Sequence, residues 1–125
     1  MNDSIEKVAV IGAGAWGTAL ALVARRAGRR VKLWARESDV VEAINRDCRN
    51  PAFLPGIVLD AGIEATVDLT EAVDGADAVL LVVPAQFLRA MAAQLAGVLE
   101  PGTPIVVCAK GIERVSGEQI GRAHV

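Results

Sequence analysis

The 125-residue sequence predicts an α/β domain with a doubly wound parallel sheet, and three observations support this fold class. Short apolar runs alternate with segments of helical periodicity, and the connections between them are short. Residues 78–83 are apolar throughout, which is typical of a parallel strand that is buried on both faces. Hydrophobic residues make up 53% of the chain and aromatic residues only 3%, so the core must consist of Ala, Val, Leu and Ile.

The first βαβ unit is the clearest part of the pattern. A strand over residues 7–11 leads into Gly12-Ala13-Gly14-Ala15-Trp16-Gly17, and good helix formers follow at once. We expect a helix over residues 16–27 and a second strand over residues 31–34, a spacing that fits one βαβ unit.

The rest of the chain continues the alternation. The expected elements are a helix over 40–46, a loop over 50–57, a strand over 63–67, a helical turn over 70–73, the strand over 78–83, a helix over 87–99 and a strand over 105–108. Gly28 is the expected C-cap of the first helix and Asp39 the expected N-cap of the second. The loop carries Phe53, Leu54 and Ile57, so we expect these apolar residues to anchor it to the core or to a ligand.

The glycine pattern predicts a dinucleotide site. Gly12 allows a sharp turn after the strand, Gly14 allows the backbone to approach a pyrophosphate, and Gly17 allows close packing of the helix on the strand. The positive end of the helix dipole and its free N–H groups would face the phosphates. The alternative is a glycine-rich turn without a ligand in an ordinary α/β domain.

Composition argues against several other classes of function. The formal net charge is −2 and no block of basic residues occurs, which disfavours binding to nucleic acid or to an anionic membrane. The apolar runs are too short for membrane insertion, and the N-terminus does not resemble a signal peptide. Cys48 and Cys108 lack the spacing of metal ligands, so we expect two free thiols, no metal and a cytoplasmic location.

The residues after the second strand bear on the choice of cofactor. Arg36 lies about 20 residues beyond the glycines and precedes the acid Glu37. A guanidinium at this position can bind a 2′-phosphate or stack on adenine, which favours NADP(H), with NAD(H) as the alternative. The alternative is that Arg36 is an ordinary surface residue at a strand end.

Two further residues are candidates for the site. Lys110 directly follows the last strand and could hold a substrate phosphate or polarise a carbonyl, although lysine is common at strand ends. Phe87 could form a wall beside the nicotinamide, or it could simply pack in the core.

The end of the chain departs from the pattern. Ile120 to Val125 have no partner element and back-translate readily to the start of a common sequencing adapter. We therefore expect residues 1–118 to form the dinucleotide-binding domain and residues 119–125 to be a non-native tail.

Five segments in this order resemble one protein family. They are Gly12–Leu20, Leu33–Arg36, Asn50–Ile57, Val82–Gln86 and Lys110–Glu113. Together they resemble the N-terminal, Rossmann-type domain of bacterial NAD(P)-dependent sn-glycerol-3-phosphate dehydrogenase. Asp60 departs from the proline that is frequent in the family, which puts the shape of that loop in doubt.

The resemblance implies reduction of dihydroxyacetone phosphate to sn-glycerol 3-phosphate for phospholipid synthesis, with NADPH or NADH as the cofactor. It implies cofactor contacts for the residues that match Ala15, Trp16, Arg36 and Lys110, a substrate contact for Lys110, and a cofactor contact for Phe87.

The family's proton-donating lysine belongs to a helical C-terminal domain that this chain does not contain, so we expect half an active site, and a homodimer for the full-length protein. The alternatives are another two-domain dehydrogenase, or a stand-alone NAD(P)-binding or redox-sensing module.

Overall fold

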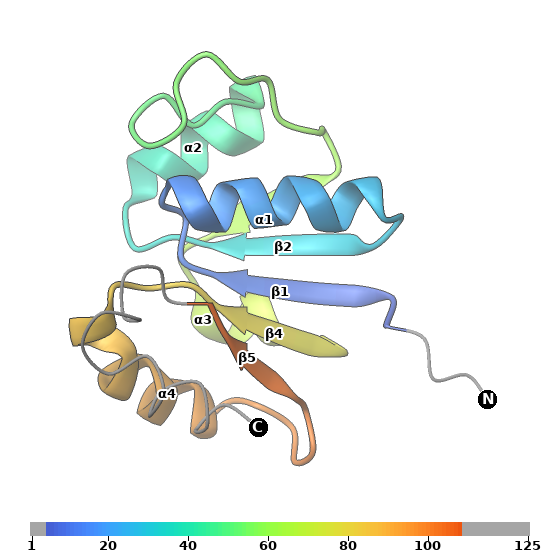
Figure 1. Cartoon of the computed structure of the whole chain (residues 1–125), viewed down its shortest axis with the longest axis vertical. Coiled ribbons are helices and arrows are strands. Elements are labelled where there is room, and N and C mark those ends of the chain that lie inside the picture. The colour runs from blue at the N-terminus through green and yellow to red at the C-terminus, as the bar shows by residue number, and fades with distance from the viewer. Residues whose placement is uncertain (1–4, 109–125) are drawn as a thin grey trace.

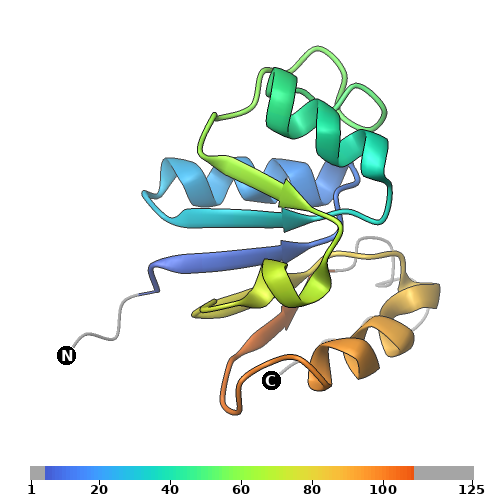
Figure 2. The same cartoon turned by 180° about the vertical axis from the view of Figure 1, so that it is seen from behind.

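The computed structural model describes residues 5–108, which form a parallel sheet between two layers of helices (Figures 1 and 2). The sheet has five strands in the order β3-β2-β1-β4-β5, and every neighbouring pair is parallel. The strands are β1 (Lys7–Ile11), β2 (Arg30–Trp34), β3 (Ile63–Thr66), β4 (Ala78–Leu81) and β5 (Ile105–Val107). The predicted doubly wound parallel sheet is confirmed.

The helices divide between the two faces of this sheet. They are α1 (Ala15–Arg26), α2 (Ser38–Asp47), α3 (Leu69–Val73), the 3₁₀ turn η1 (Ala85–Phe87) and α4 (Leu88–Ala96). Helices α1 and α2 pack on one face, and α3 and α4 pack on the other, as the two opposite views show. None of the helices within residues 5–108 is both long and apolar enough to cross a bilayer.

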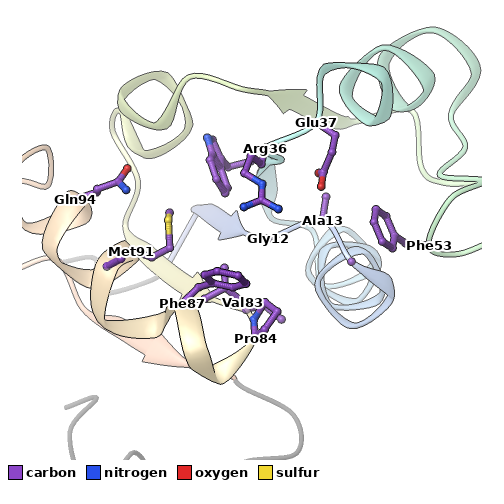
Figure 3. A pocket seen from close by; sticks show the side chains of 14 residues that line it. Gly12, Ala13, Arg36, Glu37, Phe53, Val83, Pro84, Phe87, Met91 and Gln94 are labelled. Atoms are coloured by element: carbon purple, nitrogen blue, oxygen red, sulfur yellow. The ribbon is translucent and has the colours of Figure 1, made fainter.

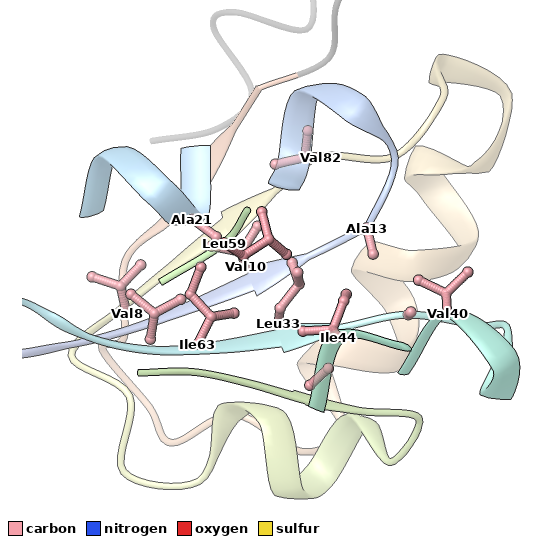
Figure 4. Close-up of a cluster of buried hydrophobic side chains, with 13 residues drawn as sticks. Val8, Val10, Ala13, Ala21, Leu33, Val40, Ile44, Leu59, Ile63 and Val82 are labelled. Carbon is pink, nitrogen blue, oxygen red and sulfur yellow. The ribbon is translucent and has the colours of Figure 1, made fainter. Parts of the chain in front are cut away.

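Alternation along the strands creates two separate cores. Val8 and Val10 of β1 point to the α1 and α2 side, where Leu33, Ala21 and Ile44 join them (Figure 4). The neighbouring residues Ala9 and Ile11 point to the other side, where they pack with residues of α3 and α4. Because β1 is buried on both faces, it is apolar at nearly every position, as its sequence indicated.

Strands β3, β4 and β5 are shorter than we predicted, and β5 ends at Val107 rather than Cys108. The predicted strand over residues 78–83 is wrong for its last two residues, because β4 ends at Leu81. The Val82 N–H still donates a hydrogen bond to the Ile11 carbonyl at 2.8 Å. Beyond that bond the chain passes Gly12, where an added Cβ would collide with the Val82 carbonyl oxygen. Strand β3 ends at Thr66 rather than Val67, where the Val67 carbonyl accepts a bond from the Trp34 indole N–H instead of a strand partner.

The predicted helix limits also need correction. Phe87 lies in the turn η1 and not in α4, which ends at Ala96 rather than Leu99. Asp39 is not the N-cap of α2, because the helix begins at Ser38 and Asp39 therefore lies in its first turn. Ala27 is the C-cap of α1, and Gly28 follows it with a φ of 84°.

The loop after α2 is anchored differently from our expectation. Leu54 packs against the core, but Phe53 and Ile57 are about two-fifths exposed. The buried residues between α2 and β3 are Asn50 and Leu59, and Asn50 is fully inaccessible to solvent. The loop is therefore held by a polar side chain as well as by an apolar one.

Candidate functional site

A cavity of about 580 Å³ lies at the carboxyl edge of the sheet (Figure 3). The sheet order reverses beside β1, since the chain builds β2 and β3 on one side of it and then crosses to β4 on the other. Ligands of doubly wound sheets bind at this kind of switch point. The cavity is lined by Gly12, Ala13, Gly14, Trp34, Arg36, Glu37, Phe53, Val82, Val83, Pro84, Phe87, Ala90, Met91 and Gln94.

Two glycines of the turn after β1 are required by the protein itself. A Cβ on Gly12 would lie 2.0 Å from the Val82 carbonyl oxygen, and the φ of Gly12 is 122°. A Cβ on Gly17 would lie 1.9 Å from the Gly12 carbonyl oxygen. The missing side chains let α1 start directly against the end of β1 and next to β4, which agrees with the sharp turn predicted at Gly12 and the close helix packing predicted at Gly17.

Gly14 has no such reason to be a glycine. A Cβ at this position would have no atom of residues 5–108 within 4 Å, and the residue has a φ of −71°, which any amino acid can adopt. Gly14 is the N-cap of α1 and lines the cavity, and no acidic residue occupies the first turn of the helix. The space beside Gly14 is thus open, and the positive end of the helix faces it, which suits an anion that must approach the backbone closely.

The two charged residues that line the cavity within residues 5–108 are Arg36 and Glu37, both from the segment after β2. The Arg36 guanidinium carbon lies 5.7 Å from the centroid of the Phe87 ring, a cation–π distance that crosses the cavity from β2 to η1. Glu37 extends on the other side, toward Ala13 (Figure 3). One wall of the cavity is therefore cationic and aromatic, and the other carries a carboxylate.

Sequence reasoning missed the part of the cavity that α4 provides. Met91 and Gln94 line it, and they follow Phe87 by four and seven residues. Residues with this spacing share one face of a helix, so the position of Phe87 could have indicated both. Phe53 was expected to anchor its loop to the core or to a ligand, and it lines the cavity from the loop after α2.

The structure brings some of the predicted site residues together and leaves others outside. Gly12, Gly14, Arg36 and Phe87 line the cavity. Ala15, Trp16 and Gly17 lie beside it in the first turn of α1, where the Trp16 side chain is about half exposed. Lys110 lies outside the described residues.

The shifted carboxyl groups lie away from this cavity. The backbone N–H groups of Lys7 and Glu6 lower the pKa of Asp77, at the opposite end of β1. The Gly62 N–H, helped by the Arg25 guanidinium, lowers the pKa of Asp60. Both carboxylates serve the framework of the domain and not its cavity.

Comparison with known proteins gives one consistent result. Residues 7–123 match the family described as NAD-dependent glycerol-3-phosphate dehydrogenase N-terminus. The chain is 58% identical over 121 residues to a glycerol-3-phosphate dehydrogenase [NAD(P)+] of Rhodospirillum rubrum. The aligned residues make up 96% of this chain and 34% of the relative. It is 63% identical over 109 residues to the protein of the same name from Paramagnetospirillum magneticum, with 87% and 39% covered. The chain thus spans little more than a third of the length of these relatives.

Solved structures agree with this result. The glycerol-3-phosphate dehydrogenase of Coxiella burnetii superposes with a TM-score of 0.79 at 31% identity, over 94% of this chain and 38% of that one. The glycerol-3-phosphate dehydrogenase of Saccharomyces cerevisiae gives a TM-score of 0.78 at 32% identity, over 86% of this chain and 34% of that one.

Proposed function

The chain belongs to the family described as NAD-dependent glycerol-3-phosphate dehydrogenase N-terminus, and from this we propose that it forms the cofactor-binding half of an enzyme that reduces dihydroxyacetone phosphate to sn-glycerol 3-phosphate. The observation that carries the proposal is the open space beside Gly14, at the N-terminus of α1 and on the wall of the cavity. Among residues 5–108 no contact accounts for the missing side chain there, whereas a bound pyrophosphate would.

The residues of the cavity fit a nicotinamide dinucleotide from end to end. The turn from Gly12 to Gly14 and the start of α1 would hold the pyrophosphate. Arg36 and Glu37, after β2, would face the adenosine half, and the segment from Val82 to Phe87, after β4, would face the nicotinamide half. When bound, the cofactor supplies the hydride that reduces the carbonyl carbon of the substrate.

Arg36 supports the finer proposal that the chain prefers NADPH. Its guanidinium is held over the Phe87 ring and forms no ion pair within residues 5–108. A guanidinium that is free to form two hydrogen bonds is suited to a 2′-phosphate. Glu37 would accept a bond from a ribose hydroxyl instead, which keeps NADH as a second cofactor.

The remaining parts of the proposal concern the whole protein. Lys110 would contact both cofactor and substrate, and the proton that completes the alcohol would come from a lysine outside this chain. A homodimer and a cytoplasmic location are proposed for the full-length protein on the family resemblance alone.

Tryptophan fluorescence tests the cofactor site directly. Trp34 lines the cavity with its indole N–H bonded to the Val67 carbonyl at 2.9 Å, and Trp16 lies in the first turn of α1. Titration of the folded chain with NADPH and then NADH should quench the emission saturably. Trp16→Phe should retain the part of the signal that Trp34 reports. A folded chain, checked by circular dichroism, that shows no saturable response to either dinucleotide would contradict the proposal.

A further inference from the structure

The buried loop residue Asn50 contacts the turn that faces the cavity. Its side-chain amide donates to the Ala13 carbonyl and to the Thr18 hydroxyl oxygen, both at 2.9 Å. Thr18 Oγ1 lies 3.3 Å from the same Ala13 carbonyl and donates to it. Asn50 and Thr18 are both fully buried, so these bonds form out of reach of water.

The bonds fix the direction of one peptide group. The Ala13–Gly14 peptide is trans, as all described peptides are, and in a trans peptide the C=O and the N–H point in opposite directions. Because Asn50 and Thr18 hold the Ala13 carbonyl toward the buried side, the Gly14 N–H must point away from it. Gly14 lines the cavity, and within residues 5–108 its N–H donates to no backbone carbonyl.

We propose that Asn50, acting together with Thr18, is a positioning residue that aims the Gly14 N–H at the phosphates of the bound dinucleotide. This inference rests on the proposed function and deepens it, since it adds a residue that touches neither cofactor nor substrate. It also explains why a loop between α2 and β3 buries an asparagine 37 residues away from the turn that it contacts.

The structure offers a close control for the substitution that tests this. Asn45 of α2 makes the same kind of contact elsewhere, since its amide donates to the Ala65 carbonyl at 3.0 Å and its carbonyl accepts from the Ala65 N–H at 2.9 Å. Neither Asn45 nor Ala65 lines the cavity. Asn50→Asp and Asn45→Asp each replace a bonded side-chain amide by an acid, but only the first changes the turn.

The experiment measures dissociation constants for NADPH and for ADP, which carries two linked phosphates without the nicotinamide half. We expect Asn50→Asp to bind both ligands at least about tenfold more weakly than wild type, since a hydrogen bond to a charged group is lost or misdirected. Asn45→Asp should lower the denaturation midpoint yet leave both constants within about twofold of wild type.

The amide resonance of Gly14 provides a readout that a purely structural role would not change. In wild type, NADPH should shift this amide proton downfield, as expected for a new bond to phosphate, and the shift should be much smaller in Asn50→Asp.

If Asn50→Asp does not fold, the pair Thr18→Val and Thr18→Ser replaces it. Valine keeps the shape but removes the hydroxyl, so it should weaken binding, and serine should restore it.

The outcomes separate the two proposals. A folded wild-type chain that binds neither NADPH nor NADH contradicts the proposed function and this inference with it. A wild type that binds, together with Asn50→Asp or Thr18→Val variants of unchanged affinity and unchanged Gly14 shift, overturns the positioning role alone. A matched loss of affinity in Asn45→Asp would also overturn it, because the effect would then follow stability rather than the direction of the peptide.

Discussion

Gly12 and Gly14 lie two residues apart, yet they lack a side chain for different reasons. At Gly12 the protein itself leaves no room, since the Val82 carbonyl occupies the place of a Cβ and the φ is 122°. At Gly14 the corresponding space holds no atom of the described residues. This difference separates a glycine that packing requires from one whose open space the proposed pyrophosphate would use, a distinction that the sequence pattern alone cannot make.

Alanine substitutions at these two positions should therefore affect different properties, stability at Gly12 and cofactor binding at Gly14. Gly12→Ala should lower the free energy of unfolding by more than about 2 kcal/mol, because it strains the backbone and displaces the Val82 carbonyl. Gly14→Ala should leave that free energy within about 1 kcal/mol of wild type but weaken NADPH binding at least about tenfold. Urea denaturation and fluorescence titration of both variants measure the two quantities. Tight binding by folded Gly14→Ala would show that the turn does not need an open backbone there.

Arg36 is the residue on which the proposed preference for NADPH would depend. Arg36→Ala should weaken NADPH binding by about tenfold more than NADH binding, since only NADPH carries the 2′-phosphate. Arg36→Lys should recover part of the loss, because lysine keeps the charge without the planar pair of donors. Arg89→Ala removes an exposed arginine that does not line the cavity and provides the matched change in net charge. Equal losses for NADPH and NADH would remove Arg36 as the selector.

At the scale of the elements, the N-terminus of α3 carries a capping signal that we overlooked. Asp68-Leu69-Thr70-Glu71 has the pattern of a capping box, and the Asp68 carboxylate accepts from the N–H groups of Thr70 and Glu71 at 3.0 and 3.3 Å. Glu71 does not complete the box, because its carboxylate accepts from the Thr66 hydroxyl instead. We predicted a cap at Asp39, where the structure places none.

Substitution at these two aspartates distinguishes a cap from a first-turn acid. Asp68→Ala should lower the free energy of unfolding by about 1 kcal/mol, the usual contribution of an N-cap side chain. Asp39→Ala should lower it by no more than about 0.5 kcal/mol, because a first-turn carboxylate interacts only with the helix dipole. Chemical denaturation of the two variants side by side measures the difference, and equal effects would contradict the assignment of the cap.

Asp77 directly precedes β4 and bonds to the start of the neighbouring strand β1. Its carboxylate makes the stability of the fold depend on pH. Its carboxylate accepts from the backbone N–H groups of Glu6 and Lys7 at 3.0 and 2.9 Å, which holds its pKa below the ordinary value. The folded state therefore binds this proton less readily than the unfolded state. The stabilising contribution is complete above roughly pH 4 and is lost as the pH falls through the lowered pKa of the folded state.

Asp77→Asn should accordingly be less stable than wild type at neutral pH, and the difference should shrink in acid. Denaturation midpoints between about pH 7 and pH 2.5 measure this dependence. The matched variant Asp74→Asn removes one exposed negative charge whose carboxylate accepts no hydrogen bond within residues 5–108, so it controls for the change in net charge. A difference for Asp77→Asn that stays constant over this pH range would show that its two hydrogen bonds do not persist in solution.

For the molecule as a whole, the sequence predicted the layers and the edge at which the site lies, because both follow from local patterns. A run such as Val79 to Leu81 can only be buried, and parallel strands must align their carboxyl ends. Asn50 could not be predicted in the same way, since its burial depends on a contact across 37 residues that no periodicity marks. The strand limits could not be predicted either: Val82 and Val83 are as apolar as a strand, but β4 ends at Leu81, and the Val82 carbonyl lies where a side chain of Gly12 would be.

The last prediction concerns what this chain can do by itself. The side chains that line the cavity within residues 5–108 include no lysine, histidine or tyrosine that could protonate a developing alkoxide. We therefore expect the chain to bind NADPH but to oxidise it only at the background rate when dihydroxyacetone phosphate is added. The absorbance of the reduced nicotinamide measures this rate.

Fusing the chain to the remaining two-thirds of the Rhodospirillum rubrum relative should restore turnover, and Gly14→Ala in that fusion should remove it again. Turnover by the chain alone would contradict a divided active site, because the proton donor would then have to lie within these 125 residues.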